Sequence, residues 1–210
     1  MPEPKEKHVV SQGETIPSIA LDTGFYWKTL WNDSNNSDLK NKRKNPNVLF
    51  AGDEVYVPDI TPKSVSRPTE ARHKFRRKGD PVKIVILLRR ADKARANEAY
   101  TMEIEGKTYK GNTDGDGKIT QKVPGDATTA TLYLNDGKEV RIVRIGSLDP
   151  VDTVTGVQQR LINQGFVCDE TGDLDDDTVR ALQKFQSKSN LTVSGEIDQP
   201  TKDKLMDLSQ

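Results

Sequence analysis

Three side chains that carry oxygen ligands alternate in the segment GNTDGDGKIT: Asn112, Asp114 and Asp116, followed by Gly117. In an EF-hand calcium loop begun at Asn112, they would fill the first, third and fifth positions, with the glycine at the sixth. The twelfth position would be Val123, where such a loop needs a bidentate glutamate. The flanking residues follow a strand pattern rather than a helical one. We therefore interpret the segment as an Asp- and Gly-rich turn between two strands and expect no calcium there.

A second group of potential metal ligands is the acidic cluster from Asp173 to Asp177. It stands where a helix is predicted to begin, which favours helix capping over metal binding. Zinc needs three or four ligands, and His8, His73 and Cys168 fall in three different segments. Cys168, the only cysteine, would need a neighbouring histidine to act as a nucleophile, and its acidic neighbours disfavour the thiolate. We expect no metal, no cofactor and no catalytic residue.

Paired carboxylates that hydrolyse glycans are the remaining catalytic class. Acidic residues are plentiful, so two of them could stand at the separation that this chemistry requires. No segment of the sequence resembles a hydrolase domain, however, and the central segment is small. We predict that the protein is not an enzyme, with the two-carboxylate hydrolase left open as the alternative.

The composition indicates several small domains rather than one large core. Of the 210 residues, 33% are hydrophobic and 30% are charged, and the formal net charge is zero. A neutral balance gives no reason to expect a nucleic-acid partner. The longest strongly apolar run, Ile84 to Leu88, is far too short to cross a membrane, so we expect no membrane partner. The first residues, MPEPKEKHVV, lack the apolar region of a secretory signal, so we expect either synthesis in the cytoplasm or an upstream signal that has been removed.

Basic residues concentrate between positions 72 and 95, where ten Lys and Arg residues stand against two Asp residues. From Leu148 onward the balance is acidic. Such unequal parts usually belong to separately folded units. The basic run is either a contact surface for an anion or acidic partner, or a solvated linker and strand flank. Its single aromatic residue, Phe75, gives little support for stacking on bases.

The first segment, up to about Asp59, has the pattern strand, helix, helix, strand. Val9 and Val10 begin a short strand, and Thr15 is a suitable N-cap for a helix with Pro17 in its first turn. A second helix is expected around Trp27 to Trp31, followed by a polar loop. The closing strand is VYVP, at residues 55–58.

The two ends of this segment resemble a LysM domain. HVVSQGETIPSIA is similar to the opening of that family, and NPNVLFAGDEVYVP is similar to its close, with Glu14, Ile16 and Ala51 as small departures. The family binds N-acetylglucosamine chains in a shallow groove between the loop after the first strand and the loop before the last. The resemblance implies a glycan-binding site at these positions here: Gly13, Glu14, Thr15, Ile16, Asn45, Pro46, Asn47 and Val48. Ile16 and Val48 are expected to offer apolar contact to the sugar.

The last segment, from about Leu148, contains an internal repeat. GDLDDDT, at 172–178, is echoed by GEIDQPT, at 195–201, and each places an Asp where it can cap a helix. The stretches VQQRLINQGF, TVRALQKFQ and LTVSGEIDQPTKDKL resemble the type 1 peptidoglycan-binding domain of three helices. Asp175 and Asp198 replace the usual glycine of that family, and Asp176 replaces a proline.

The central segment has the alternation of short strands. Asn135, Asp136 and Gly137 predict a hairpin turn between the last two of them. The number and length of the strands suggest a small antiparallel β-sandwich, and the segment weakly resembles bacterial Ig-like or transthyretin-like modules. The predicted strands are 82–88, 99–105, 107–109, 118–123, 129–134 and 139–145.

Together these patterns predict a multidomain α+β protein. The predicted parts are a βααβ LysM domain at 6–59, a linker at 60–80, a β-sandwich domain at 81–146 and a peptidoglycan-binding-like helical domain at 148–210. The predicted function is non-catalytic binding of peptidoglycan that anchors or targets an assembly to the bacterial cell wall. The alternative is a structural or adaptor component of a contractile injection system (type VI secretion) or phage tail, docked to a spike, baseplate or effector through the β domain. The expected place of action is the cell wall or periplasm, or an exported assembly.

Overall fold

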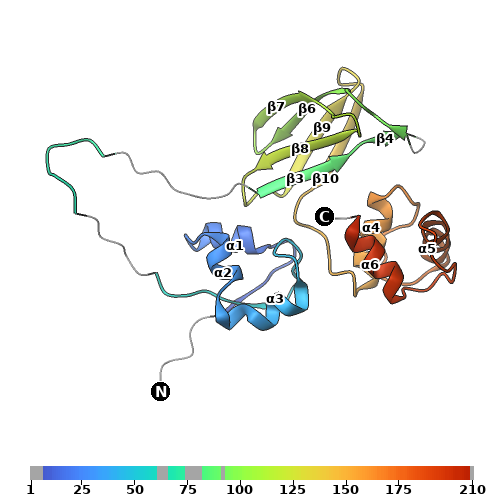
Figure 1. The fold of residues 1–210 in the computed structure, drawn as a ribbon, viewed down its shortest axis with the longest axis horizontal. Coiled ribbons are helices and arrows are strands. Elements are labelled where there is room, and N and C mark those ends of the chain that lie inside the picture. Colours follow the sequence, from blue (N-terminus) through green and yellow to red (C-terminus); the bar gives the residue numbers. More distant parts are fainter. Residues whose placement is uncertain (1–6, 61–65, 74–81, 91–92, 209–210) are drawn as a thin grey trace.

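The structure is a computed structural model that describes residues 7–60, 66–73, 82–90 and 93–208. Residues 61–65 and 74–81 of the predicted linker and of the basic run, Phe75 included, lie outside the described residues. The fold is a mixed α+β arrangement with several small antiparallel sheets and a helical part at the C-terminus (Figure 1). In the part described, no helix is long and apolar enough to cross a bilayer.

Buried apolar residues form three clusters, each drawn from one stretch of the chain. We call these stretches the N-terminal unit (7–60), the β unit (82–145) and the helical unit (148–208). Three small cores agree with the low hydrophobic content of the sequence, because a chain with few apolar residues does not fill one large interior.

The N-terminal unit holds its helices between two short strands. Strands β1 and β2 pair antiparallel, with His8 opposite Val55. Helix α1 begins at a capping box, in which the Thr15 side chain accepts from the Ser18 amide and the Ser18 hydroxyl accepts from the Thr15 amide. The elements are β1 (Lys7–Val9), α1 (Ile16–Asp22), α2 (Trp27–Trp31), η1 (Ser34–Asn36), α3 (Ser37–Arg43) and β2 (Glu54–Tyr56).

The polar loop expected after α2 is largely helical, which corrects the sequence interpretation. Asp33 caps the short helix η1 by accepting from the Asn35 amide, and α3 follows at once. The buried Asn36 side chain donates to the carbonyls of Leu30 and Tyr56 and accepts from the Tyr56 amide. One buried amide therefore ties α2, η1 and β2 together. Hydrophobic periodicity missed α3 because Leu39 is its only buried residue.

The β unit has two layers around one core. A four-stranded antiparallel sheet has the order β10-β9-β6-β7, and the β3–β8 pair packs on it (Figure 1). Met102, Leu132 and Ile119 are among the core residues contributed by both layers. The strands are β3 (Val82–Leu87), β4 (Arg89–Arg90), β5 (Lys93–Ala94), β6 (Ala99–Ile104), β7 (Lys107–Asn112), β8 (Lys118–Val123), β9 (Thr129–Leu134) and β10 (Glu139–Arg144).

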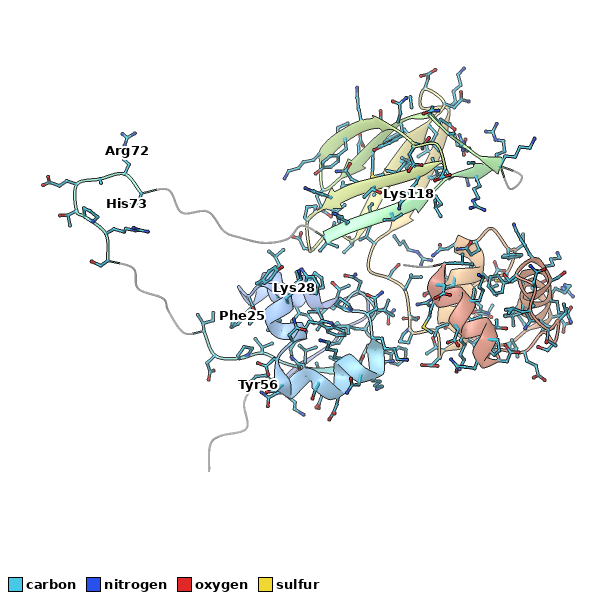
Figure 2. All side chains as sticks on the ribbon, in the orientation of Figure 1. Phe25, Lys28, Tyr56, Arg72, His73 and Lys118 are labelled. Atoms are coloured by element: carbon cyan, nitrogen blue, oxygen red, sulfur yellow. The ribbon has the colours of Figure 1, made fainter. Side chains whose placement is uncertain are left out.

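Turns of the β unit lie where the sequence predicts them. Residues 135–137 connect β9 to β10 with positive φ at all three positions. Asp114 stabilises the turn between β7 and β8, because its Oδ1 accepts from the amides of Asp116 and Lys118 (Lys118 is labelled in Figure 2). This carboxylate oxygen, one of the potential calcium ligands, thus accepts hydrogen bonds from two backbone amides of the turn. The small β4–β5 pair within the basic run was not predicted.

Three helices make up the helical unit: α4 (Val154–Asn163), α5 (Asp176–Lys188) and α6 (Gln199–Asp207). Each begins at a side-chain cap, namely Thr153, Asp175 and Asp198. The core between them contains Leu161, Leu182, Phe185 and Leu205, all essentially without exposed surface. The predicted helix starts within the repeat are therefore found at Asp175 and Asp198.

Candidate functional site

The two loops that the sequence singles out lie side by side in the N-terminal unit. The Ile16 amide donates to the Pro46 carbonyl at 2.9 Å, and the Gly52 amide donates to the Val10 carbonyl at 2.8 Å. These two hydrogen bonds join segment 10–16 to segment 46–52 near both ends. All eight predicted glycan-binding residues lie on these two segments or, in the case of Asn45, directly beside them.

The first loop is already engaged in internal contacts. Glu14 Oε2 accepts from the Ser11 amide at 2.7 Å and lies 2.8 Å from His8 Nε2. Thr15 is buried and caps α1, while Gly13 is exposed with φ of 86°. Ile16 has 0% of its surface exposed and belongs to the core, so its side chain does not offer the expected apolar contact. The periodicity that placed Ile16 on the helix also predicts this burial.

The second loop is more open. The Asn45 side chain accepts from the Asn47 amide at 2.9 Å, which forms an Asx-type turn. Asn45, Pro46 and Val48 are half-buried, and Asn47 is exposed. Of the two apolar side chains expected to meet a sugar, only Val48 has solvent-accessible surface in this structure.

A buried ion pair between Arg43 and Asp53 lies next to the second loop, and the sequence did not predict it. Arg43 Nε and Nη2 donate to the two carboxylate oxygens of Asp53 at 2.6 and 2.8 Å, and Lys42 adds a contact at 3.3 Å. Asp53 Oδ2 also accepts from the Phe50 amide at 3.0 Å. Burial raises the pKa of Asp53, but the hydrogen bonds from Arg43 and Phe50 outweigh it and hold that pKa below its ordinary value.

Segment 146–149, at the junction of the β and helical units, contacts one end of the loop pair. Gln12 Nε2 donates to Asp149 Oδ1 at 3.0 Å. A Cβ at Gly146 would stand 2.9 Å from Thr15 Cγ2 and 3.7 Å from the Gly13 carbonyl oxygen. Asp149 belongs to the helical unit, where its carbonyl also accepts from the buried Arg160 at 2.6 Å. Segment 146–149 therefore joins the first loop of the N-terminal unit to the helical unit.

In the helical unit, two buried glutamines play the same part in the two halves of the repeat. Gln158 donates to Thr171, Thr178 and the Asp173 carbonyl, and accepts from the Gly172 amide. Gln186 repeats this pattern one helix later. It donates to Ser194, Thr201 and the Glu196 carbonyl, and accepts from the amides of Ser194 and Gly195. Each glutamine fixes one Gly-x-x-Asp turn to the helix before it, which the sequence repeat alone did not reveal.

The family model described as "putative peptidoglycan binding domain" matches residues 151–205. No curated protein and no solved structure matches the chain. The match supports peptidoglycan binding by the helical unit, and hence association with the cell wall. We call this unit the peptidoglycan-binding module below. The match spans α4, α5, all but the last two residues of α6, and both glutamine-fixed turns of the helical unit.

Two acidic residues of the peptidoglycan-binding module, Asp175 and Asp198, act as helix caps. Asp175 Oδ1 accepts from the Thr178 amide at 2.8 Å and Asp198 Oδ1 from the Thr201 amide at 2.9 Å. Hydrogen bonds from Thr178 and Thr201 lower the pKa of Asp175 and Asp198, respectively. Among the described residues, no group of three or more His, Cys, Asp and Glu side chains is placed to hold a metal ion.

The three candidate zinc or nucleophile residues are not brought together. His8 contacts Glu14, and His73 Nε2 lies 2.9 Å from the Pro68 carbonyl on the segment between the N-terminal and β units (Figure 2). Cys168 is buried in the peptidoglycan-binding module. Burial, followed by the charges of Asp175 and other acids nearby, raises the pKa of its thiol. This environment disfavours the thiolate that a nucleophile requires.

A shallow depression of about 420 Å³ lies on the outward face of α5. Its lining residues are Arg180, Gln183, Lys184, Ser187 and Lys188. All five come from the polar side of one amphipathic helix. This helix has acidic residues in its first turn and a basic residue in its last, which is the arrangement that the helix dipole favours. We assign no ligand to this surface.

Proposed function

We propose that the protein is a non-catalytic peptidoglycan-binding protein that anchors or targets an assembly to the bacterial cell wall. The observation that carries this proposal is the match of residues 151–205 to a peptidoglycan-binding family, on a part of the chain where three capped helices and two glutamine-fixed turns form a complete core.

The N-terminal unit is proposed as a second, LysM-type glycan-binding part. Support comes from the resemblance of both ends of its sequence, from the pairing of its first and last strands, and from the two loops that hydrogen bonds hold together. Gly13 and Asn47 are exposed, so the Gly13 backbone and the Asn47 side chain suit hydrogen bonding to acetamido groups of N-acetylglucosamine. Two weak sites on one chain raise the overall affinity for a polymer through effective concentration.

Sedimentation of the full chain with purified sacculi tests this function. We expect the protein to pellet with intact sacculi and to be released by short N-acetylglucosamine oligomers or by muramidase digestion of the sacculi. Mass spectrometry of the supernatant should show no wall fragments released by the protein alone. Failure to pellet at low and physiological salt would refute the binding function, and released fragments would refute its non-catalytic character.

A second candidate function is an adaptor in a contractile injection system or phage tail, and one observation favours it. Strand β10 is an edge of the four-stranded sheet, and it exposes Val140 by 51% and Ile142 by 74%. An open edge with exposed apolar side chains is suited to pairing with another protein. Affinity purification from the native cell tests this role. Recovery of a spike, baseplate or effector protein with the wild type, and its loss with Ile142→Lys, would support docking through the β unit.

A further inference from the structure

Phe50 is an exposed aromatic residue beside the paired loops of the N-terminal unit. Its relative exposure is 40%, whereas the preceding Leu49 is buried in the core. Val48, on the other side of Leu49 in the chain, is half-buried, so both neighbours of Leu49 reach solvent. Val48 is one of the residues predicted to meet a glycan, and Phe50 adds exposed apolar surface two residues further on.

The ring of Phe50 is held in place by the buried ion pair described above. The Arg43 guanidinium carbon lies 5.7 Å from the ring centroid, and the Arg43 side chain is only 9% exposed because Asp53 binds it. The Phe50 amide donates to the same Asp53 carboxylate. Backbone and ring are thus fixed from the protein side before any ligand arrives, which lowers the entropy cost of binding.

The other expected contacts of the loop pair are largely taken. Ile16 is buried, Thr15 caps α1 and Glu14 is bonded within its own loop, so Gly13 is the one residue of these four that stays exposed. Available surface therefore concentrates on the second segment, at 47–51, where Asn47, Phe50 and Ala51 are exposed.

We propose that Phe50 is the stacking platform of the N-terminal glycan site. One pyranose ring of an N-acetylglucosamine unit lies with its apolar C–H face on the exposed part of the phenyl ring. Val48 widens this apolar surface, and the Asn47 side chain bonds the acetamido group. Sugars present an apolar face of ring hydrogens, and the electron-rich face of an aromatic ring attracts such weakly positive groups. The inference rests on the proposed glycan-binding function and names the residue that provides its main apolar contact.

Titration of the full chain with short β-1,4-linked N-acetylglucosamine oligomers tests the assignment. Phe50→Ala is expected to weaken binding about tenfold, which is the loss of one stacking contact. Phe50→Tyr and Phe50→Trp are expected to keep affinity within about twofold, because both retain an aromatic face. Phe50→Leu keeps an apolar side chain without a π-face and should bind as weakly as the Ala variant. Ile142→Ala, an exposed apolar residue of the β unit, is the matched control and should bind like the wild type.

Thermal unfolding of every variant separates lost stacking from lost folding. The comparison of Leu with Tyr at equal melting temperature decides the question even if the Ala variant is unstable. Equal affinity of the wild type and the Leu variant would overturn the role of Phe50. Absence of binding by the wild type to both oligomers and sacculi would instead overturn the glycan-binding function itself.

Discussion

Two buried glutamines show how one side chain stabilises a turn of this protein through several hydrogen bonds. Gln158 and Gln186 each use both the oxygen and the nitrogen of the side-chain amide, so each links a Gly-x-x-Asp turn to the helix before it. A buried amide that is lost leaves several donors and acceptors without partners, and that cost exceeds the net value of the bonds themselves. The Gly-x-x-Asp turns therefore depend on residues outside them.

Gln186→Ala is expected to lower the free energy of unfolding by about 2 to 4 kcal/mol, because the buried Gly195 amide loses its acceptor and the buried Thr201 hydroxyl loses its donor. Urea unfolding followed by circular dichroism measures this change. Gln183→Ala on the same helix is the matched control, since Gln183 is exposed. A similar loss in both variants would show that the hydrogen bonds of Gln186 are unimportant.

Asp53 gives the N-terminal unit a defined response to acid. Its folded pKa lies below the ordinary value of 3.8, so its contribution is fully present above that pH and is lost as pH falls through the lower folded pKa. Wild type is therefore expected to be more stable than Asp53→Asn at pH 7, with the difference shrinking below about pH 4. Thermal unfolding from pH 7 to pH 2 checks this trend. A difference that stays constant over the whole range would contradict the ion pair with Arg43.

At the scale of elements, helix caps decide where the helices begin. Asp175 caps α5, whereas the adjacent Asp176 lies within the first turn and makes no cap hydrogen bond. Asp175→Ala is expected to cost about 1 kcal/mol of stability. Asp176→Ala removes the same charge and should cost much less, which unfolding curves of the two variants will show. Equal costs would mean that charge at the helix start, rather than the cap, stabilises α5.

Elements with their own local signals could be predicted from the sequence, and elements without them could not. Strands β8 and β9 lie where alternation places them, and the caps at Thr15, Asp175 and Asp198 mark helix starts. Helix α3 has one buried residue and no apolar stripe, so no periodicity marks it. For the candidate site, motif resemblance named two loops, and the structure places them side by side. The burial of Ile16 and the hold of Arg43 on Phe50 depend on tertiary packing, which no local pattern contains.

At the scale of the whole molecule, segment 146–149 sets the relation between units. Gly146 has φ of 70° and no room for a side chain against Thr15. Gly146→Val is expected to push this segment away from the loop and to weaken the Gln12–Asp149 contact. Small-angle X-ray scattering should then report a larger radius of gyration at an unchanged melting temperature of each unit. Gly106→Val is the control, because Gly106 also has positive φ but open space around it. An unchanged radius for Gly146→Val would refute the role of this contact.

The contact between Gln12 and Asp149 also has a consequence for biosynthesis. The two residues are separated by 137 positions in the chain. At a translation rate of roughly 5 to 20 residues per second, Asp149 is made about 7 to 27 seconds after Gln12. The N-terminal unit, which carries Gln12, can therefore fold while the rest of the chain is still being made, and during this time Asp149 does not yet contact Gln12. Its neighbour Asp149 is made only after the β unit, so the contact between this loop and segment 146–149 forms later than the N-terminal unit itself.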